Sequence, residues 1–329
     1  MASGLSRSTE PSGTRPIPPR TSRAAAASWA ARWTPPGRSA RKAFPAFSTT
    51  TVTERSTVGD TLNSHPDVDV ASSTGSGPFA DGVAGATVST AQRRSPNSGA
   101  SPPRSCLPNG DLDIAVTTAM FYAIGSSGQI CGAASRTLVR RESEGEFLDL
   151  LTTRVEALRG GDPRAEDTFL VPVVSADQWS TVQDYIHQGI DAGARLVVGG
   201  MRKPDLPDEF RDGHFAKPTV VVANDLIIAR DEIFGPAMPV VAYDMIEEAV
   251  RIANDSPFGL CGCVTSADPV RVCEAAEQMR TGSALINDAD SEFNTGWGGY
   301  RQSGNGREWA DFGIGEHLEI KSIVGMTAA

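Results

Sequence analysis

The segment Gly128–Arg136 places one cysteine, Cys131, among small residues. A thiol with little side-chain bulk beside it is open to a substrate, and its thiolate is a strong nucleophile. Lone cysteines are more often inert packing residues in a core. Taken alone, the residues therefore leave two interpretations of Cys131 open, a nucleophile and a packing residue.

The other four cysteines, Cys106, Cys261, Cys263 and Cys273, are spaced too irregularly for a disulfide framework, and no apolar signal-peptide core follows Met1. Both features predict a reducing, cytoplasmic setting. The Cys-X-Cys pair of Cys261 and Cys263 resembles a metal-binding pattern, but alternate residues of a strand share one face and no histidine cluster accompanies the pair. We predict that these two cysteines pack in the core and that no metal is bound.

The composition is 40% hydrophobic and 21% charged, and no run of 18 or more apolar residues occurs, which predicts no membrane span. The net charge of −10 is unevenly distributed along the chain. Residues 1–50 hold eight basic side chains and one acidic one, a net +7, so the remaining residues carry −17. An acidic main body argues against a nucleic-acid partner. The basic arm is interpreted as a disordered or non-native segment, with a binding arm or transit peptide as alternatives.

Residues 1–105 show little sustained hydrophobic periodicity, because Gly, Pro, Ser, Thr, Ala and Arg dominate. Such a segment buries too little apolar area to offset its chain entropy. One island stands out. Residues 57–70, followed by Ser73–Ser76, predict a short helix, a turn and a strand that ends in a loop of small residues. A loop of this kind can present backbone N–H groups to a phosphate.

After Asp111 the pattern changes to alternating strands and helices. Cap residues and apolar spacing predict helices over 111–125, 144–158, 175–193, 244–253 and 268–282, and strands over 137–139, 195–200, 215–223, 240–242, 260–264 and 284–286. This alternation predicts βαβ units, a largely parallel sheet and an α/β fold. A short helix over 307–312 and an alternating strand over 318–324 end the chain, and that strand is expected to pair with another domain or subunit, or to lie at a sheet edge.

Four motifs occur in one order along the chain: Gly-Gln-Ile-Cys at 128–131, Asp-Glu-Ile-Phe-Gly-Pro at 231–236, Ala-Asn-Asp-Ser-Pro-Phe-Gly-Leu at 253–260 and Gly-Gly-Tyr-Arg-Gln-Ser-Gly-Asn-Gly-Arg-Glu at 298–308. Their order and spacing resemble the aldehyde dehydrogenase superfamily. The resemblance runs over about residues 109–325 and includes the island at 57–76. It leaves out most of 1–56 and 77–108.

This resemblance implies a parallel-sheet catalytic domain of the aldehyde dehydrogenase type with a largely incomplete Rossmann-like cofactor domain. The expected domains are a low-complexity, disordered or frame-shifted segment over 1–56, a remnant of the cofactor domain over 57–108, a catalytic α/β domain over 109–297, and a tail with an oligomerisation strand over 298–329. The protein is expected to be a homo-oligomer if that strand pairs as in the family.

The resemblance also implies the site. Cys131 matches the nucleophile, whose thiolate attacks an aldehyde, after which hydride passes to NAD or NADP and water hydrolyses the thioester. The backbone N–H of Cys131 is expected to be one oxyanion donor. Glu232 matches the carboxylate that binds the nicotinamide ribose, and Phe234 the ring packed beside the nicotinamide. Asn287 and the loop to Trp297 match the segment that shapes the substrate entrance, where a small-molecule aldehyde would enter.

Two expected groups have no match. The family's water-activating glutamate is missing, since no Glu lies between Glu54 and Glu142, and the region Ala91–Ala100 lacks its motif. The oxyanion-hole asparagine after a Pro-Trp pair is also missing. We hypothesise that residues 1–56 and 77–108 arose from shifts of reading frame. The alternatives to an active dehydrogenase are an inactive remnant or binding module of the same fold, and a cofactor-independent thiol esterase.

Overall fold

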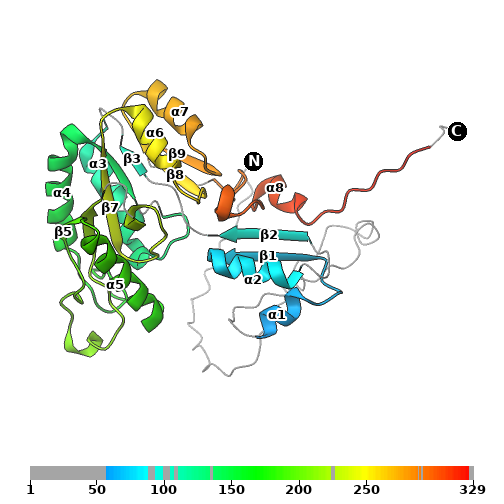
Figure 1. Cartoon of the computed structure of the whole chain (residues 1–329), viewed down its shortest axis with the longest axis horizontal. Helices are drawn as coiled ribbons and strands as arrows, with labels where there is room; N and C mark the ends of the chain where they lie inside the picture. The colour runs from blue at the N-terminus through cyan, green and yellow to red at the C-terminus, as the bar shows by residue number, and fades with distance from the viewer. Residues whose placement is uncertain are drawn as a thin grey trace, which may run out of the picture. The chain divides into compact units, whose positions relative to one another are not determined.

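The computed structural model of the chain (Figure 1) describes residues 57–87, 93–98, 104–106, 110–133, 136–223, 227–287, 289 and 292–325. The contacts between residues divide the chain into two units, residues 1–62 and residues 63–329. Of the first unit, the described part is helix α1, which spans Thr57–Asn63 and reaches the unit boundary. The predicted low-complexity segment over 1–56 lies outside the described residues.

A seven-stranded sheet organises the second unit. In spatial order its strands are β5 (Arg195–Val198), β6 (Thr219–Val222), β7 (Ala237–Tyr243), β4 (Thr137–Arg140), β3 (Arg104–Cys106), β8 (Cys261–Thr265) and β9 (Ser283–Ile286). Neighbouring strands are parallel except for β5 and β6, which pair in antiparallel fashion. The prediction of an α/β fold with a largely parallel sheet is confirmed, with one antiparallel strand at the edge.

Helices cover both faces of this sheet (Figure 1). The helices are α3 (Leu112–Ile124), α4 (Glu144–Glu156), α5 (Ala176–Asp191), α6 (Ile246–Asn254) and α7 (Pro269–Gln278), with 3-10 turns η4 (Gly125–Gly128), η5 (Arg141–Ser143), η6 (Asp208–Phe210), η7 (Ile227–Ala229) and η8 (Arg301–Ser303). Consecutive residues of β4 point to opposite faces. Leu138 packs with α5, α6 and α7, whereas Val139 packs with α3 and α4. Both faces of the central strands are therefore buried, as parallel sheets require.

Several predicted helix starts are confirmed. The Asp111 carboxylate accepts from the backbone N–H groups of residues 113 and 114, and Asp268 caps α7 in the same way. The prediction that Asp244 caps α6 is wrong. Met245 occupies the N-cap position, and the Asp244 carboxylate instead accepts two hydrogen bonds from Arg141, at 2.8 and 3.1 Å. A bidentate guanidinium competes successfully for a carboxylate that a helix N-terminus could otherwise use.

A second, two-stranded sheet is formed by β1 (Val70–Gly75) and β2 (Arg93–Ser98), which run parallel and are joined through helix α2 (Gly77–Thr87). The predicted helix, turn and strand of the 57–76 island are confirmed. Strand β2 pairs with β1 over six residues although its sequence, Arg-Arg-Ser-Pro-Asn-Ser, has no strand-like pattern. Main-chain hydrogen bonds make such pairing largely independent of the side chains, which is why the hydrophobic pattern missed it.

The end of the chain differs from its prediction. Helix α8 spans Ala310–Gly315, three residues later than expected, and residues 319–325 continue from it without regular secondary structure (Figure 1). Side chains in this segment are exposed, and Ile320 and Val324 keep 98% and 93% of their surface. The expectation of an edge strand within this chain is therefore wrong, because no described strand lies beside it to pair with.

Replacing Phe147, which is fully buried between α4 and the sheet, should show how much this core stabilises the fold. We expect Phe147→Ala to lower the free energy of unfolding by about 3–5 kcal/mol, since it removes a large side chain and leaves a cavity. The matched control is Phe121→Ala on α3, where the ring is 56% exposed, with an expected loss below about 1 kcal/mol. Urea denaturation measures both, and equal losses would contradict the assigned core.

Candidate active site

Cys131 lies in a tight turn between α3 and β4. The backbone N–H of Ala133 donates to the carbonyl of Ile130 at 3.0 Å and closes the turn around the cysteine, which is half-buried. Two side chains just before the turn hold it in place. Ser127 exchanges hydrogen bonds with the backbone of Val171, and the Gln129 amide oxygen accepts from the N–H of Val174 at 2.9 Å. The predicted nucleophile therefore sits in a fixed loop with a partly accessible side chain.

The backbone before Cys131 is strained. Ser126, Ser127 and Gly128 have φ angles of 50°, 54° and 72°, a left-handed run that non-glycine residues rarely adopt. Gly128 is required here on a second ground, because a Cβ at this position would overlap the carbonyl group of Gly235. The Cys131 loop and the Asp231–Pro236 segment thus touch backbone to backbone, and the fold brings two of the four motifs together.

The buried cysteines behave as predicted for packing residues. Cys261 and Cys263 on β8 are both almost fully buried, and both are free thiols, as are Cys131 and Cys273. The pKa of the Cys261 thiol is raised well above its ordinary value by a hydrogen bond with Cys263, by burial, and by the nearby thiols of Cys263 and Cys131. A thiol in that state is not a nucleophile at neutral pH, which leaves the half-exposed Cys131 as the reactive candidate of this group.

The Asp231–Pro236 segment is positioned by helix α5. The Gln178 amide nitrogen donates to the carbonyls of Ile233 and Phe234, each at 3.0 Å. Ser175 and Gln178 have the spacing of a capping box, a pattern in which the Gln178 side chain would bond to the start of its own helix. The Ser175 hydroxyl does accept from the Gln178 N–H at 3.1 Å, but the Gln178 side chain serves the other segment. Ile233 is buried in the core, and Glu232 and Phe234 beside it are half-buried.

Tyr185, two turns further along α5, adds a second contact to this segment. Its hydroxyl donates to the Asp231 carboxylate at 3.1 Å. Burial raises the pKa of Tyr185, and the negative charges of Asp231 and Glu232 raise it further. The phenol therefore stays protonated and remains a donor across the physiological pH range. Together with Gln178 it fixes both ends of the stretch that carries Glu232 and Phe234.

An aromatic group lies next to the Cys131 turn. The Trp297 and Trp309 rings stack with centroids 5.2 Å apart, and Phe293 lies 4.7 Å from Trp309. A Cβ on Gly132 would come within 3.2 Å of the Trp297 ring, so this tryptophan packs against the residue after the predicted nucleophile. Trp297 and its neighbours belong to the segment expected to shape the substrate entrance. Sequence reasoning missed Trp309, because only the fold brings it onto Trp297.

A buried arginine connects the chain segments that carry three of the four motifs. Arg136, five residues after Cys131, donates from Nη1 to the carbonyl of Ala229 at 2.7 Å, just before the Asp231–Pro236 segment. It also donates to the carbonyls of Ala253 and Asp255 at 3.5 and 3.4 Å, within the 253–260 motif. Burial lowers the pKa of Arg136 to about 10, despite the opposing attraction of Asp255. Its charge is thus held in the interior by carbonyl oxygens.

The 253–260 and 298–308 motifs are held together by hydrogen bonds between side chains and backbone groups. Arg301 donates to the carbonyls of Asn254 and Ser256, and the Ser303 hydroxyl accepts from the Gly259 N–H at 2.9 Å. The Asn254 side chain connects the ends of α6 and α7 through Gln278 and Arg280. These residues carry no evident chemistry. They hold the site's framework, a role that the motif pattern by itself did not distinguish from catalysis.

Comparison with known proteins agrees with this geometry. The model of the aldehyde dehydrogenase family matches residues 38–323, well over half of the chain. The chain belongs to the aldehyde dehydrogenase family. The match also takes in residues 77–108, which the motifs had left outside the resemblance, so those limits were drawn too narrowly. Helix α2 and strand β2 within that stretch give the structural reason.

Relatives of this aldehyde dehydrogenase family chain are considerably longer. It is 38% identical over 270 residues to a Staphylococcus saprophyticus protein that carries the family's name, covering 82% of this chain and 56% of that protein. A cysteine-to-alanine mutant of aldehyde dehydrogenase C from Pseudomonas syringae, solved with NAD+ and octanal, is 37% identical with a TM-score of 0.78, covering 83% of this chain and 56% of that one. The chain thus spans little more than half the length of these relatives.

Betaine aldehyde dehydrogenase from Staphylococcus aureus, solved with NAD+, is 32% identical and superposes with a TM-score of 0.76. The match covers 80% of this chain and 52% of that structure. The α/β architecture described above is therefore that of aldehyde dehydrogenases over part of their length. No described helix has both the length and the apolar character needed to cross a bilayer.

The Gln178 amide should be needed to hold the Glu232 segment. We expect Gln178→Met, which keeps the volume but removes both donors, to lower the free energy of unfolding by about 1–3 kcal/mol, because two carbonyls lose their partners. Hydrogen exchange should accelerate at residues 231–235. The control is Gln188→Met, an exposed position of the same helix. Unchanged exchange in the Gln178 variant would show that the amide does not fix this segment.

Arg136→Lys should reveal how far the fold depends on the shape of the guanidinium. A lysine ammonium cannot reach carbonyls on two separate segments as a planar guanidinium does, so we expect a loss of about 1–3 kcal/mol in the free energy of unfolding. Arg140→Lys at the end of β4 is the control, because Arg140 makes one partly exposed ion pair with Glu142 at 2.9 Å. Equal effects of the two substitutions in thermal denaturation would argue against the buried linkage.

Proposed function

We propose that this chain oxidises an aldehyde to a carboxylic acid with NAD or NADP, through a covalent intermediate on Cys131. The observation that carries the proposal is the backbone contact between Gly128 and Gly235. It joins the strained Cys131 loop to the segment bearing Glu232 and Phe234. A nucleophile beside a fixed carboxylate and an aromatic ring is an arrangement suited to a thiol attack next to a bound nicotinamide.

In the proposed reaction the Cys131 thiolate attacks the carbonyl carbon, a C–S bond forms, and the carbonyl electron pair moves to oxygen. The developing oxyanion would be stabilised by the Cys131 backbone N–H, as expected from the family pattern. A bound nicotinamide would supply the acceptor for the hydride that leaves this carbon. A thioester then remains on Cys131, and attack by water breaks the C–S bond, releases the acid and restores the thiolate.

Features on two segments support cofactor binding. Glu232 would accept hydrogen bonds from the nicotinamide ribose, and Phe234 would pack beside the ring, in a segment that Gln178 holds at the carbonyls of Ile233 and Phe234. The β1–α2 turn suits a phosphate, since α2 begins at Gly77 and its first turn has no acidic residue. Gly75 has no space for a side chain, because a Cβ there would overlap the Phe79 ring.

Hydrolysis of the thioester is expected to be the slow step. The family's water-activating glutamate has no match in the region Ala91–Ala100. Strand β2, which pairs with β1 in this region, has no carboxylate among its residues Arg93–Ser98. Without a general base, deacylation should slow by roughly 10²–10⁴. The acyl group should therefore accumulate on Cys131.

The aromatic group of Phe293, Trp297 and Trp309 favours an apolar aldehyde. Its rings lie beside the Cys131 turn and give an entering chain an apolar surface. The exposed apolar residues of 318–324 are proposed to pair with a second copy of the chain, which makes a homo-oligomer. We also propose that the protein is cytoplasmic.

The proposal is tested by mixing the purified chain with octanal and either NAD+ or NADP+. We expect one rapid equivalent of reduced cofactor per chain, followed by slow turnover, and an acyl adduct detected by intact mass. Cys131→Ala should abolish both signals, whereas Cys273→Ala, an exposed cysteine on α7, should leave them unchanged.

The other outcomes separate the alternatives. No burst and no adduct with either cofactor would show an inactive member of the fold. Turnover of p-nitrophenyl acetate that is lost in Cys131→Ala but indifferent to added cofactor, without any aldehyde oxidation, would show a thiol esterase.

A further inference from the structure

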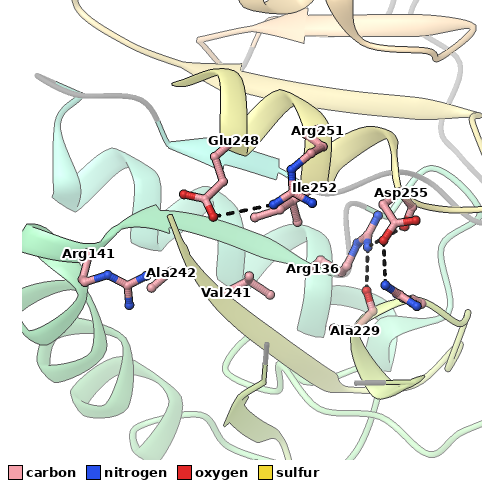
Figure 2. A pocket seen from close by; sticks show the side chains of 10 residues that line it. Arg136, Arg141, Ala229, Val241, Ala242, Glu248, Arg251, Ile252 and Asp255 are labelled. Carbon is pink, nitrogen blue, oxygen red and sulfur yellow. Dashed lines mark hydrogen bonds and ion pairs between the residues drawn. The ribbon is translucent and has the colours of Figure 1, made fainter. Parts of the chain in front are cut away.

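A pocket of about 170 Å³ lies between α6, β7 and the start of β4 (Figure 2). Six charged residues line it: Arg136, Arg141, Arg230, Arg251, Glu248 and Asp255. The remaining lining is apolar. The pocket includes none of the residues assigned to aldehyde chemistry, and its arginines come from three separate segments of the chain.

The charges around the pocket do not balance. Once Arg141 is set against its partner Asp244, three guanidinium groups face two carboxylates, so the lining carries an excess charge of +1. Arg230 bonds to Asp255 at 2.7 Å, and Arg251 reaches Glu248 at 3.7 Å. Arg141 is bound by Asp244, which lies outside the pocket lining.

Arg136 contributes the charge that is hardest to accommodate. The residue exposes only 5% of its surface, and Nη1 and Nη2 donate hydrogen bonds to backbone carbonyls, as Figure 2 shows for Ala229. Carbonyl oxygens satisfy the donors but do not neutralise the charge. A buried cation is costly unless a counter-charge lies nearby, and the lowered pKa of Arg136 reflects that cost. Asp255 attracts Arg136 but is itself bound to Arg230 at 2.7 Å, so an anion in the pocket would add counter-charge for both guanidinium groups.

The size of the pocket limits the ligand. Sites for drug-sized molecules have volumes of about 300–1,000 Å³, so this pocket suits a smaller group. Guanidinium groups bind phosphate oxygens with two parallel hydrogen bonds, which an ammonium cannot do. Because arginines reach the pocket from three separate segments, an oxyanion with three or four oxygens can bind several of them at once, which favours it over a carboxylate with two oxygens.

We propose that this pocket is a binding site for a phosphate-sized oxyanion, either free phosphate or the phosphate group of a small molecule, held by Arg136, Arg230 and Arg251. The site is independent of the aldehyde chemistry proposed for Cys131. Arg230 lies two residues before Glu232, so a bound anion would also stabilise the start of that segment.

Isothermal titration calorimetry of the full chain with inorganic phosphate, at constant ionic strength in sodium chloride, tests the site. We expect one phosphate per chain, and Arg251→Gln should weaken binding by at least about tenfold. Glu248→Gln, which removes a negative charge from the lining, should tighten it. Arg271→Gln is the matched control, because Arg271 on α7 pairs with Asp268 at the same i,i+3 spacing and lies outside the pocket.

Thermal denaturation without phosphate verifies that each variant folds, and phosphate should then raise the melting temperature of the wild type more than that of Arg251→Gln. Phenyl phosphate distinguishes the two sources of the oxyanion. If it binds as tightly as inorganic phosphate, the ligand is a phosphate ester; if it does not bind, the ligand is free phosphate. Absence of binding to the wild type at millimolar phosphate would overturn the proposal. The same would follow if Arg251→Gln and Arg271→Gln bound phosphate equally well.

Discussion

The arrangement of this protein depends on one buried guanidinium. Arg136 reaches from the end of the Cys131 loop to the carbonyl of Ala229 and to those of Ala253 and Asp255, so it connects segments that lie 93 to 119 residues apart in the chain. Each of these segments carries one of the motifs that define the family. Because a buried charge must keep its hydrogen bonds, the three segments are constrained to one arrangement.

Close packing around two glycines is a second constraint, because neither position has room for a side chain. Gly128 lies against Gly235, and Gly235 in turn lies against Val182 on α5, in each case too closely for a Cβ. The glycines of the two motifs are therefore packing requirements as well as turn residues. The same helix carries Gln178 and Tyr185, so α5 supports the Glu232 segment by packing and by hydrogen bonds together.

The sequence predicted those features that depend on nearby residues. The helices capped by Asp111 and Asp268, the strand over 137–139 and the packing role of Cys261 and Cys263 follow from local patterns, and all were found. Predictions failed where a distant group competed. Asp244 binds Arg141 rather than its own helix, Gln178 binds a segment 55 residues away, and no strand among the described residues lies beside 318–324.

The sequence by itself determined the family and the lack of any glutamate between Glu54 and Glu142, and it predicted Cys131 as the nucleophile. Each of these is a matter of residue type and order. The tertiary structure alone decided which carbonyls surround Arg136, that Trp309 stacks on Trp297, and that four arginines share one pocket. Such pairings depend on where separate stretches of chain cross, and local backbone preferences contain no information about that.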